Sequence, residues 1–425
     1  MTSLRTFNST NLEQIPQVLS LSQEERLSIK TVAEILPFRV NNYVVNELID
    51  WNNIPNDPIF RLTFPQREML KTEHFEQMRA LIVKEASTAE KRVLAAKIQA
   101  SLNPNPAGQK THNIPELEGS AVQGMQHKYR ETVLFFPSQG QTCHAYCAYC
   151  FRWSQFVGIK DIKFASNDID RLIAYLCAHP EVTDVIFTGG DPMVMKCRVL
   201  EKYIKPLLEL ENLKTIRIGT KSLAWWPYRF TTDKDSDDLM RLFETVVASG
   251  KHLAIMAHSS HPRELQPKVL EQAVKRIRAT GAIIRTQAPI IRYVNDCSKV
   301  WESLWQRQVE LGMIPYYMFM ERDTGAKNYF KLPLATALKV FQQAYSGLSG
   351  IARTVRGPSM SCIPGKILVD GIVEIGGKPL FVLKFLQARK QAWSNRVFFA
   401  EFDEEACWMD DLRPAFGAKE FFFNT

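Results

Sequence analysis

Residues 132–152 have the sequence Thr-Val-Leu-Phe-Phe-Pro-Ser-Gln-Gly-Gln-Thr-Cys-His-Ala-Tyr-Cys-Ala-Tyr-Cys-Phe-Arg. The β-prone run at 132–136 predicts a strand that leads into Cys143, Cys147 and Cys150, spaced C-x3-C-x2-C. Three thiolates can hold three irons of a [4Fe–4S] cluster and leave the fourth iron open to a ligand. A zinc site would need a fourth protein ligand and usually has paired C-x2-C motifs, so zinc or a chance grouping is the alternative.

Beyond this stretch, short apolar runs alternate with amphipathic runs. This alternation predicts βα units, a parallel sheet and a partial or complete barrel of about six units, that is, a partial (βα)6-type barrel in an α/β fold. Ligands of such a sheet bind at the carboxyl ends of its strands. Strands are expected at 184–187, 215–218, 252–256, 282–286 and 316–319, and helices at 168–178, 199–210, 239–248, 267–280 and 298–311.

The N-terminal and C-terminal regions have a different residue pattern from this central part. Residues 1–125 are predicted to be helical, with a capping box of Ser22 and Glu25 and one long helix from Gln77 to Ala100. We expect the barrel core at 126–357 and a small β-containing extension at 358–425, in which two strands meet at Gly376-Gly377.

The composition indicates a globular protein with ample length for a core, since 45% of the 425 residues are hydrophobic and 23% are charged. Neither a membrane-spanning run nor a secretory signal is visible, so we expect a cytoplasmic protein without a membrane partner. The net charge of +8 is spread over helix faces. Nucleic acid is therefore not the favoured partner. The alternative function is that of a binding protein that acts on RNA or on a protein partner.

Two features suggest what binds at the open iron. Tyr149 precedes the last cysteine, where a flat ring can stack on adenine. Gly189, Gly190 and Asp191 follow the second predicted strand, where glycines let a ligand's amino and carboxylate groups approach the backbone. Gly-Gly-Asp-Pro is also a good turn. With the cysteines, these features indicate radical chemistry on S-adenosylmethionine (SAM).

The chain resembles the radical SAM superfamily and, within it, the lysine 2,3-aminomutase family, from about residue 20 to about residue 380. The resemblance implies reductive cleavage of SAM to a 5′-deoxyadenosyl radical, hydrogen abstraction from an amino acid, and 1,2-migration of its amino group on pyridoxal 5′-phosphate (PLP). It also implies an electron donor such as flavodoxin or ferredoxin, and a homo-oligomer is compatible with it. The ordered motifs that carry it are Pro55-Asn56-Asp57-Pro58, Thr188–Asp191, Arg217–Thr220, His258–Pro262, Val294–Asp296, Pro315–Tyr317, and Arg356-Gly357 ahead of Val369-Asp370.

The resemblance also implies roles for single residues. Arg152 would hold the substrate carboxylate, and His258 and Gln287 would lie at the active site and cofactor site. Asp370 matches one of two aspartates that hold the distal ammonium of lysine, but Arg322 falls at the other position. Lysine is therefore not established as the substrate.

The implied PLP site departs from the family in two places. Lys378 matches the lysine that forms the Schiff base, yet it comes one residue late after Asp370 and beside a glycine pair typical of a hairpin turn. Lys128 matches one of two basic residues for the phosphate, while Thr132 replaces the other. A PLP-independent radical SAM enzyme that modifies a different amino-acid-like or peptide substrate is therefore the alternative.

Overall fold

The computed structural model describes residues 3–108, 112–158 and 164–424. Its main element is a sheet in which the strands from β5 to β15 lie side by side in chain order. Neighbouring strands from β6 to β12 run parallel, and the pairs outside that range are antiparallel. The chain is thus a mixed α/β protein with a large sheet that is mostly parallel, as the alternating pattern predicts.

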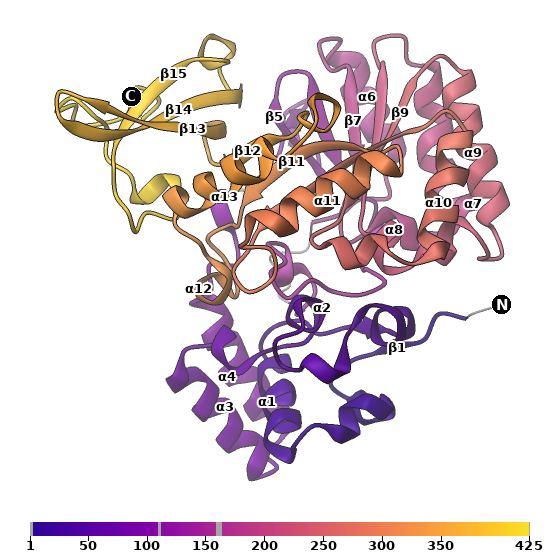
Figure 1. The fold of residues 1–425 in the computed structure, drawn as a ribbon. Coiled ribbons are helices and arrows are strands. Elements are labelled where there is room, and N and C mark those ends of the chain that lie inside the picture. Colours follow the sequence, from indigo (N-terminus) through magenta and orange to yellow (C-terminus); the bar gives the residue numbers. More distant parts are fainter. Residues whose placement is uncertain (1–2, 109–111, 159–163, 425) are drawn as a thin grey trace.

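The predicted strands appear as β6 to β11 and the predicted helices as α6, α7, α9, α10 and α11, whereas β5, β12, α8, α12 and α13 were not predicted (Figure 1). The strands are β5 (Met125–Tyr129), β6 (Thr132–Phe135), β7 (Asp184–Phe187), β8 (Thr215–Thr220), β9 (His252–His258), β10 (Ile283–Ile290), β11 (Ile314–Met320) and β12 (Arg356–Ser361). The helices are α6 (Ile169–Ala178), α7 (Cys197–Ile204), α8 (Ser222–Trp225), α9 (Ser236–Ala248), α10 (Lys268–Ala279), α11 (Ser298–Glu310), α12 (Lys327–Phe330) and α13 (Leu334–Ser346). Apolar side chains of the strands and of the longer helices form one continuous core.

The sheet curls so that its first parallel strands approach its last. On β5, the Nζ of Lys128 donates to the carbonyl oxygens of Cys362, which follows β12, and of Gly365, the first residue of β13 (Gly365–Ile375). The carboxyl ends of the parallel strands lie along one edge of this sheet, where ligands of parallel sheets bind.

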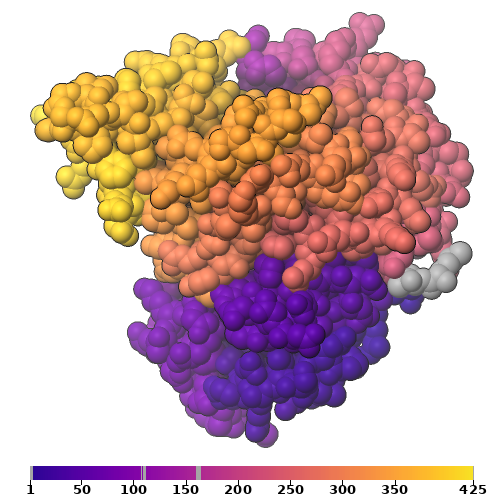
Figure 2. Space-filling model, viewed as in Figure 1, coloured from indigo at the N-terminus to yellow at the C-terminus, as the bar shows by residue number. Residues whose placement is uncertain are grey.

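The N-terminal region packs against one side of the part of the chain that holds this sheet (Figures 1 and 2). It contains β1 (Thr6–Phe7), β2 (Val40–Asn41), α1 (Gln23–Ala33), α2 (Pro58–Thr63), α3 (Thr72–Val83) and α4 (Thr88–Ala100). Its apolar side chains share a second core with Trp153, Trp225 and Phe330, which belong to loops or short helices after the strands β6, β8 and β11. The region therefore covers the edge of the sheet where the predicted site lies.

Local capping signals determine the helix ends here. The predicted capping box of Ser22 and Glu25 is confirmed at the start of α1. The prediction of one helix from Gln77 to Ala100 is wrong, because α3 ends at Val83 and a second capping box, formed by Ser87 and Glu90, starts α4.

The predicted helix at 199–210 is also shorter than expected. The α-helical part, α7, ends at Ile204, and residues Lys205–Glu209 form a 3-10 turn that contains Pro206. Proline lacks the N–H that an α-helical hydrogen bond needs, which explains the early end.

The C-terminal part extends the sheet. Strands β13 and β14 (Lys378–Ala388) form the predicted hairpin around Gly376-Gly377, and β15 (Val397–Glu401) pairs with β14. The aromatic end of the chain packs on this extension, with Phe422 and Phe423 both in ring contact with Phe385. The domain boundaries at 125 and 357 remain predictions.

Candidate active site

The cysteine loop lies at the carboxyl end of β6 and is held from outside the sheet. The backbone N–H groups of Tyr146 and Ala148 donate to the carbonyl oxygens of Arg39 and Leu62, each at 2.8 Å. The guanidinium of Arg39 also donates to Oγ1 of Thr142 at 2.6 Å. The N-terminal region therefore fixes the path of the loop that carries the three cysteines.

All three cysteines are free thiols that are partly accessible. Burial raises the pKa of each, that of Cys147 to about 12, so iron binding requires displacement of their protons. Among the described residues, no three His, Cys, Asp or Glu side chains are grouped closely enough for a single metal ion. A cubane cluster takes each of its thiolates on a separate iron.

The glycines after β7 are required because the cysteine loop passes directly over them. A Cβ on Gly190 would lie 2.6 Å from the backbone N and the carbonyl carbon of Thr142. The N–H of Gly190 donates to the carbonyl oxygen of Gly140 at 3.1 Å, and the N–H of Asp191 donates to that of Thr142 at 2.7 Å. These two N–H groups are bonded to the cysteine loop. Only the other backbone groups of the Gly189–Asp191 motif are therefore available to bind a ligand.

The side chain of Asp191 is an internal anchor rather than a free acceptor. It is buried, and its carboxylate accepts hydrogen bonds from the hydroxyls of Thr220 and Ser222 and from the backbone N–H groups of Met193, Lys221 and Ser222. Burial raises its pKa, and these hydrogen bonds oppose that rise. The anchor joins the loops after β7 and β8 beneath the cysteines.

Tyr149 points toward a polar group that sequence reasoning missed. Its hydroxyl lies 3.2 Å from Oγ of Ser260, and Nζ of Lys221 lies 3.4 Å from the same oxygen. Lys221 also forms an ion pair at 2.7 Å with Glu264, which is fully buried. Ser260 lies within the His258–Pro262 motif, and Lys221 and Glu264 closely follow the Arg217–Thr220 and His258–Pro262 motifs in the chain, which was the available signal.

His258, the last residue of β9, lies side by side with Gln287 within β10. Their side chains meet at 2.8 Å, from Nε2 of the histidine to Nε2 of the glutamine. Burial lowers the pKa of His258 to about 3, with Lys221 contributing, so this histidine is neutral at neutral pH. A neutral imidazole beside an amide can orient a polar ligand group without adding charge.

Arg152, Lys128 and Arg322 surround a cavity of about 110 Å³ beside the cysteine loop. Among the described residues that line it, none is a carboxylate. Nε of Arg152 and Nη1 of Arg322 are buried without a hydrogen-bond partner. Burial lowers the pKa of Arg152 to about 10 and, with Arg322, that of Lys128 to about 7. Such a cavity favours an anionic group.

Asp370 and Lys378 do not join this group. Both side chains are exposed on the extension, and Lys378 follows the turn that closes the hairpin of β13 and β14. From the start of β13, the chain runs away from the cysteine loop for about 30 Å, at roughly 3.3 Å per residue, before this turn.

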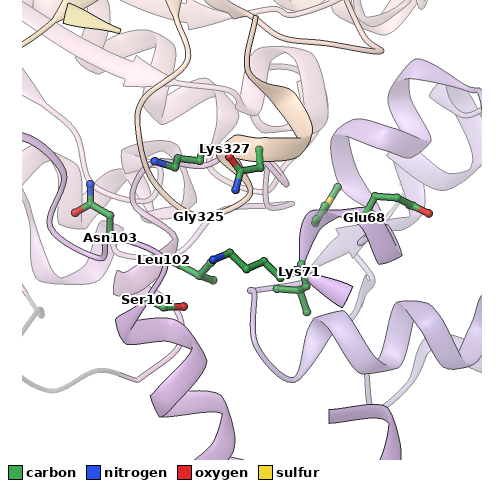
Figure 3. A pocket seen from close by; sticks show the side chains of 10 residues that line it. Glu68, Lys71, Ser101, Leu102, Asn103, Gly325 and Lys327 are labelled. Carbon is green, nitrogen blue, oxygen red and sulfur yellow. The ribbon is translucent and has the colours of Figure 1, made fainter. Parts of the chain in front are cut away.

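A larger cavity, of about 430 Å³, lies elsewhere (Figure 3). It is formed where the loop after β11, with Gly325 and Lys327, meets Glu68, Lys71 and Asn103 of the N-terminal region. None of the sequence-predicted site residues lines it. Cavity size alone therefore does not locate the reaction.

Comparison with known proteins supports the assignment of the cysteine loop. Residues 130–263 match the family described as "4Fe-4S single cluster domain". The chain is 32% identical over 402 residues to a protein of Aquifex aeolicus named "Putative L-lysine 2,3-aminomutase", covering 94% of this chain and 92% of that protein. It is 24% identical to the L-lysine 2,3-aminomutase of Clostridium subterminale, covering 80% of this chain and 70% of that one.

Among solved structures, a radical SAM methyltransferase from Sphaerobacter thermophilus overlays with a TM-score of 0.38 and 15% identity, covering 56% of this chain and 68% of that chain. No helix among the described residues is both long and apolar enough to cross a membrane.

The chain is an enzyme whose cofactors are a [4Fe–4S] cluster and SAM, and it belongs to the lysine 2,3-aminomutase family of radical SAM proteins.

Proposed function

We propose that this enzyme uses its cluster and SAM to abstract a hydrogen atom from a free amino acid and to move the amino group to the adjacent carbon. Cys143, Cys147 and Cys150 hold the cluster, and the curled sheet works as a partial (βα)6 barrel that encloses the reaction. The observation that carries the proposal is the cationic cavity beside the cysteine loop, where the buried Nε of Arg152 lacks a partner. A substrate carboxylate supplies that partner.

The same cavity also restricts the charge of the substrate side chain. Lys128 and Arg322 line it, and Asp370 lies exposed on β13. A distal ammonium would meet like charge at this place, while a neutral or acidic side chain would not. We therefore propose an amino acid without a distal ammonium, in contrast to the lysine in the names of the relatives.

The experiment is an anaerobic assay of the reconstituted protein with SAM, a flavodoxin or chemical reductant, and matched pairs of amino acids. Glutamate, glutamine and lysine form one set, because they differ mainly in the charge of the distal group. The proposal predicts 5′-deoxyadenosine release and a β-amino product with glutamate or glutamine. Release of 5′-deoxyadenosine with lysine alone would overturn the proposal that the substrate lacks a distal ammonium. Release without any product of amino-group migration would favour the alternative of a different radical modification.

A further inference from the structure

The guanidinium groups of Arg152 and Arg322 line the same cavity beside the cysteine loop, but they come from distant parts of the chain. Arg152 lies over Phe136, with its guanidinium carbon 4.1 Å from the ring centroid, and Arg322 lies over Phe151 at 4.5 Å. None of the described residues that line the cavity is a carboxylate. Because like charges repel strongly away from water, other contacts must hold the two segments that carry these arginines together.

The hydroxyl of Thr324 joins these two segments. The indole Nε1 of Trp153, the residue after Arg152, donates to Oγ1 of Thr324 at 2.8 Å. Thr324 lies two residues after Arg322, and its N–H donates to the carbonyl oxygen of Arg322 at 2.8 Å. Trp153 also packs against the next residue, Gly325, where a Cβ would lie 2.9 Å from Cδ1 of the indole. Both Trp153 and Thr324 are buried, so this contact is shielded from water.

The N-terminal region holds the same hydroxyl from a third side. Oγ1 of Thr324 donates to the carbonyl oxygen of Asn103 at 2.5 Å while it accepts from Trp153. Nδ2 of Asn103 in turn donates to the carbonyl oxygen of Asp323 at 2.5 Å. A methyl group in place of this hydroxyl would leave the buried indole N–H without its acceptor, and such a loss is costly.

We propose that Thr324 is a positioning residue, which acts through Trp153 to hold Arg152 and Arg322 together as one site for the carboxylate of the substrate. The inference rests on the proposed function and deepens it, because it assigns both arginines to one anionic group. Two planar guanidinium groups bind one carboxylate well only when their separation is fixed. Without the hydroxyl, the two segments move apart under the repulsion of the arginines, and the affinity for the anion falls.

The test measures equilibrium binding of glutarate, a dicarboxylate without an amino group, to the reconstituted protein by calorimetry in the absence of SAM. Thr324→Val removes the hydroxyl at nearly constant volume, and we expect binding to weaken by about fivefold or more. Thr324→Ser keeps the hydroxyl and should restore binding to within about twofold of the wild type. The matched control Thr286→Val removes another buried hydroxyl, which bonds Gln308 away from this cavity, and should leave the affinity unchanged.

Two further variants keep the test decisive. Asn103→Gly removes the hydrogen bond to Asp323 and serves if Thr324→Val does not fold, because Asn103 is exposed and its φ of 50° suits glycine. We expect it to weaken glutarate binding by about twofold or more. Arg322→Met should weaken binding by about tenfold or more, which places the glutarate in the cavity.

The opposite results overturn the inference. Wild-type affinity in Thr324→Val or Asn103→Gly, or equal weakening in Thr286→Val, refutes the positioning role. Absence of glutarate binding to the wild type, or binding that ignores Arg322→Met, refutes the shared anion site.

Release of 5′-deoxyadenosine with the amino acids of the proposed assay is measured on the same preparations. We expect Thr324→Val to raise KM for the amino acid by about fivefold while kcat changes by less than about twofold. Release with an unchanged KM refutes the inference and leaves the proposed function standing. No release with any amino acid, while glutarate binding still depends on Thr324, refutes the proposed function alone.

Discussion

Gly190→Ala is predicted to displace the cysteine loop while leaving the rest of the fold in place. A Cβ at this position would lie 2.6 Å from two backbone atoms of Thr142, whereas ordinary contacts begin at 3.4 Å. The loop must therefore move by about 1 Å, and a misplacement of that size can reduce a rate by about a hundredfold. The movement also strains the hydrogen bonds from the N–H groups of Gly190 and Asp191, at about 1 kcal/mol each.

The assay measures iron and sulfide per chain after anaerobic reconstitution, the rate of 5′-deoxyadenosine release, and thermal unfolding. We expect Gly190→Ala to lose most of its iron and about two orders of magnitude in rate. Gly371→Ala is the matched control, because its Cβ would meet no atom within 4 Å. Full iron and a wild-type rate in Gly190→Ala would refute the reasoning that this glycine is required by the close approach of the loop.

The remaining predictions concern other contacts of the site. Asp191→Asn places amide hydrogens against the hydroxyl and N–H donors of Ser222. We therefore expect the free energy of unfolding, measured with urea, to fall by about 2–3 kcal/mol. An unchanged free energy of unfolding would contradict the anchor role. Arg39→Met removes the hydrogen bond to Thr142, so a chelator should strip iron faster than from the wild type, and equal rates would contradict this. Lys128 has a pKa of about 7 in the folded chain, below its unfolded value of 10.5, so its contribution to stability is fully present above about pH 10.5 and is lost as the pH falls to about 7. Between about pH 7 and about pH 9 the wild type should therefore gain on the order of 2 kcal/mol relative to Lys128→Met, and parallel pH profiles would refute the shift.

Local signals predicted much of the fold, since strands and helices are determined by nearby residues. The capping box of Ser22 and Glu25 is one example, and the pattern of alternating strands and helices predicted the parallel strands from β6 to β11, but not β12. The single long helix was wrong because the equally local signal of Ser87 and Glu90 was overlooked.

The sequence identified candidate site residues through motifs, including the distant pair His258 and Gln287, but not the contacts that loops from other strands make. The cysteines, Tyr149 and Arg152 form one motif, whereas the anchoring role of Asp191 depends on the approach of loops from other strands. Lys378 follows a glycine pair, as the resemblance requires, but it lies exposed at the outer turn of the hairpin of β13 and β14. The direction of β13 places it there, and a sequence does not contain that direction.

The most direct test of the central claim is 5′-deoxyadenosine release by the reconstituted protein with SAM and a reductant. If Cys143, Cys147 and Cys150 hold a [4Fe–4S] cluster with one open iron, we expect about four irons per chain and turnover of SAM, both abolished in the triple Cys→Ala variant. The control variant Cys177→Ala changes an exposed cysteine outside the loop and should behave as wild type. SAM cleavage that survives the triple substitution, or a wild-type protein that takes up no iron, would contradict the account.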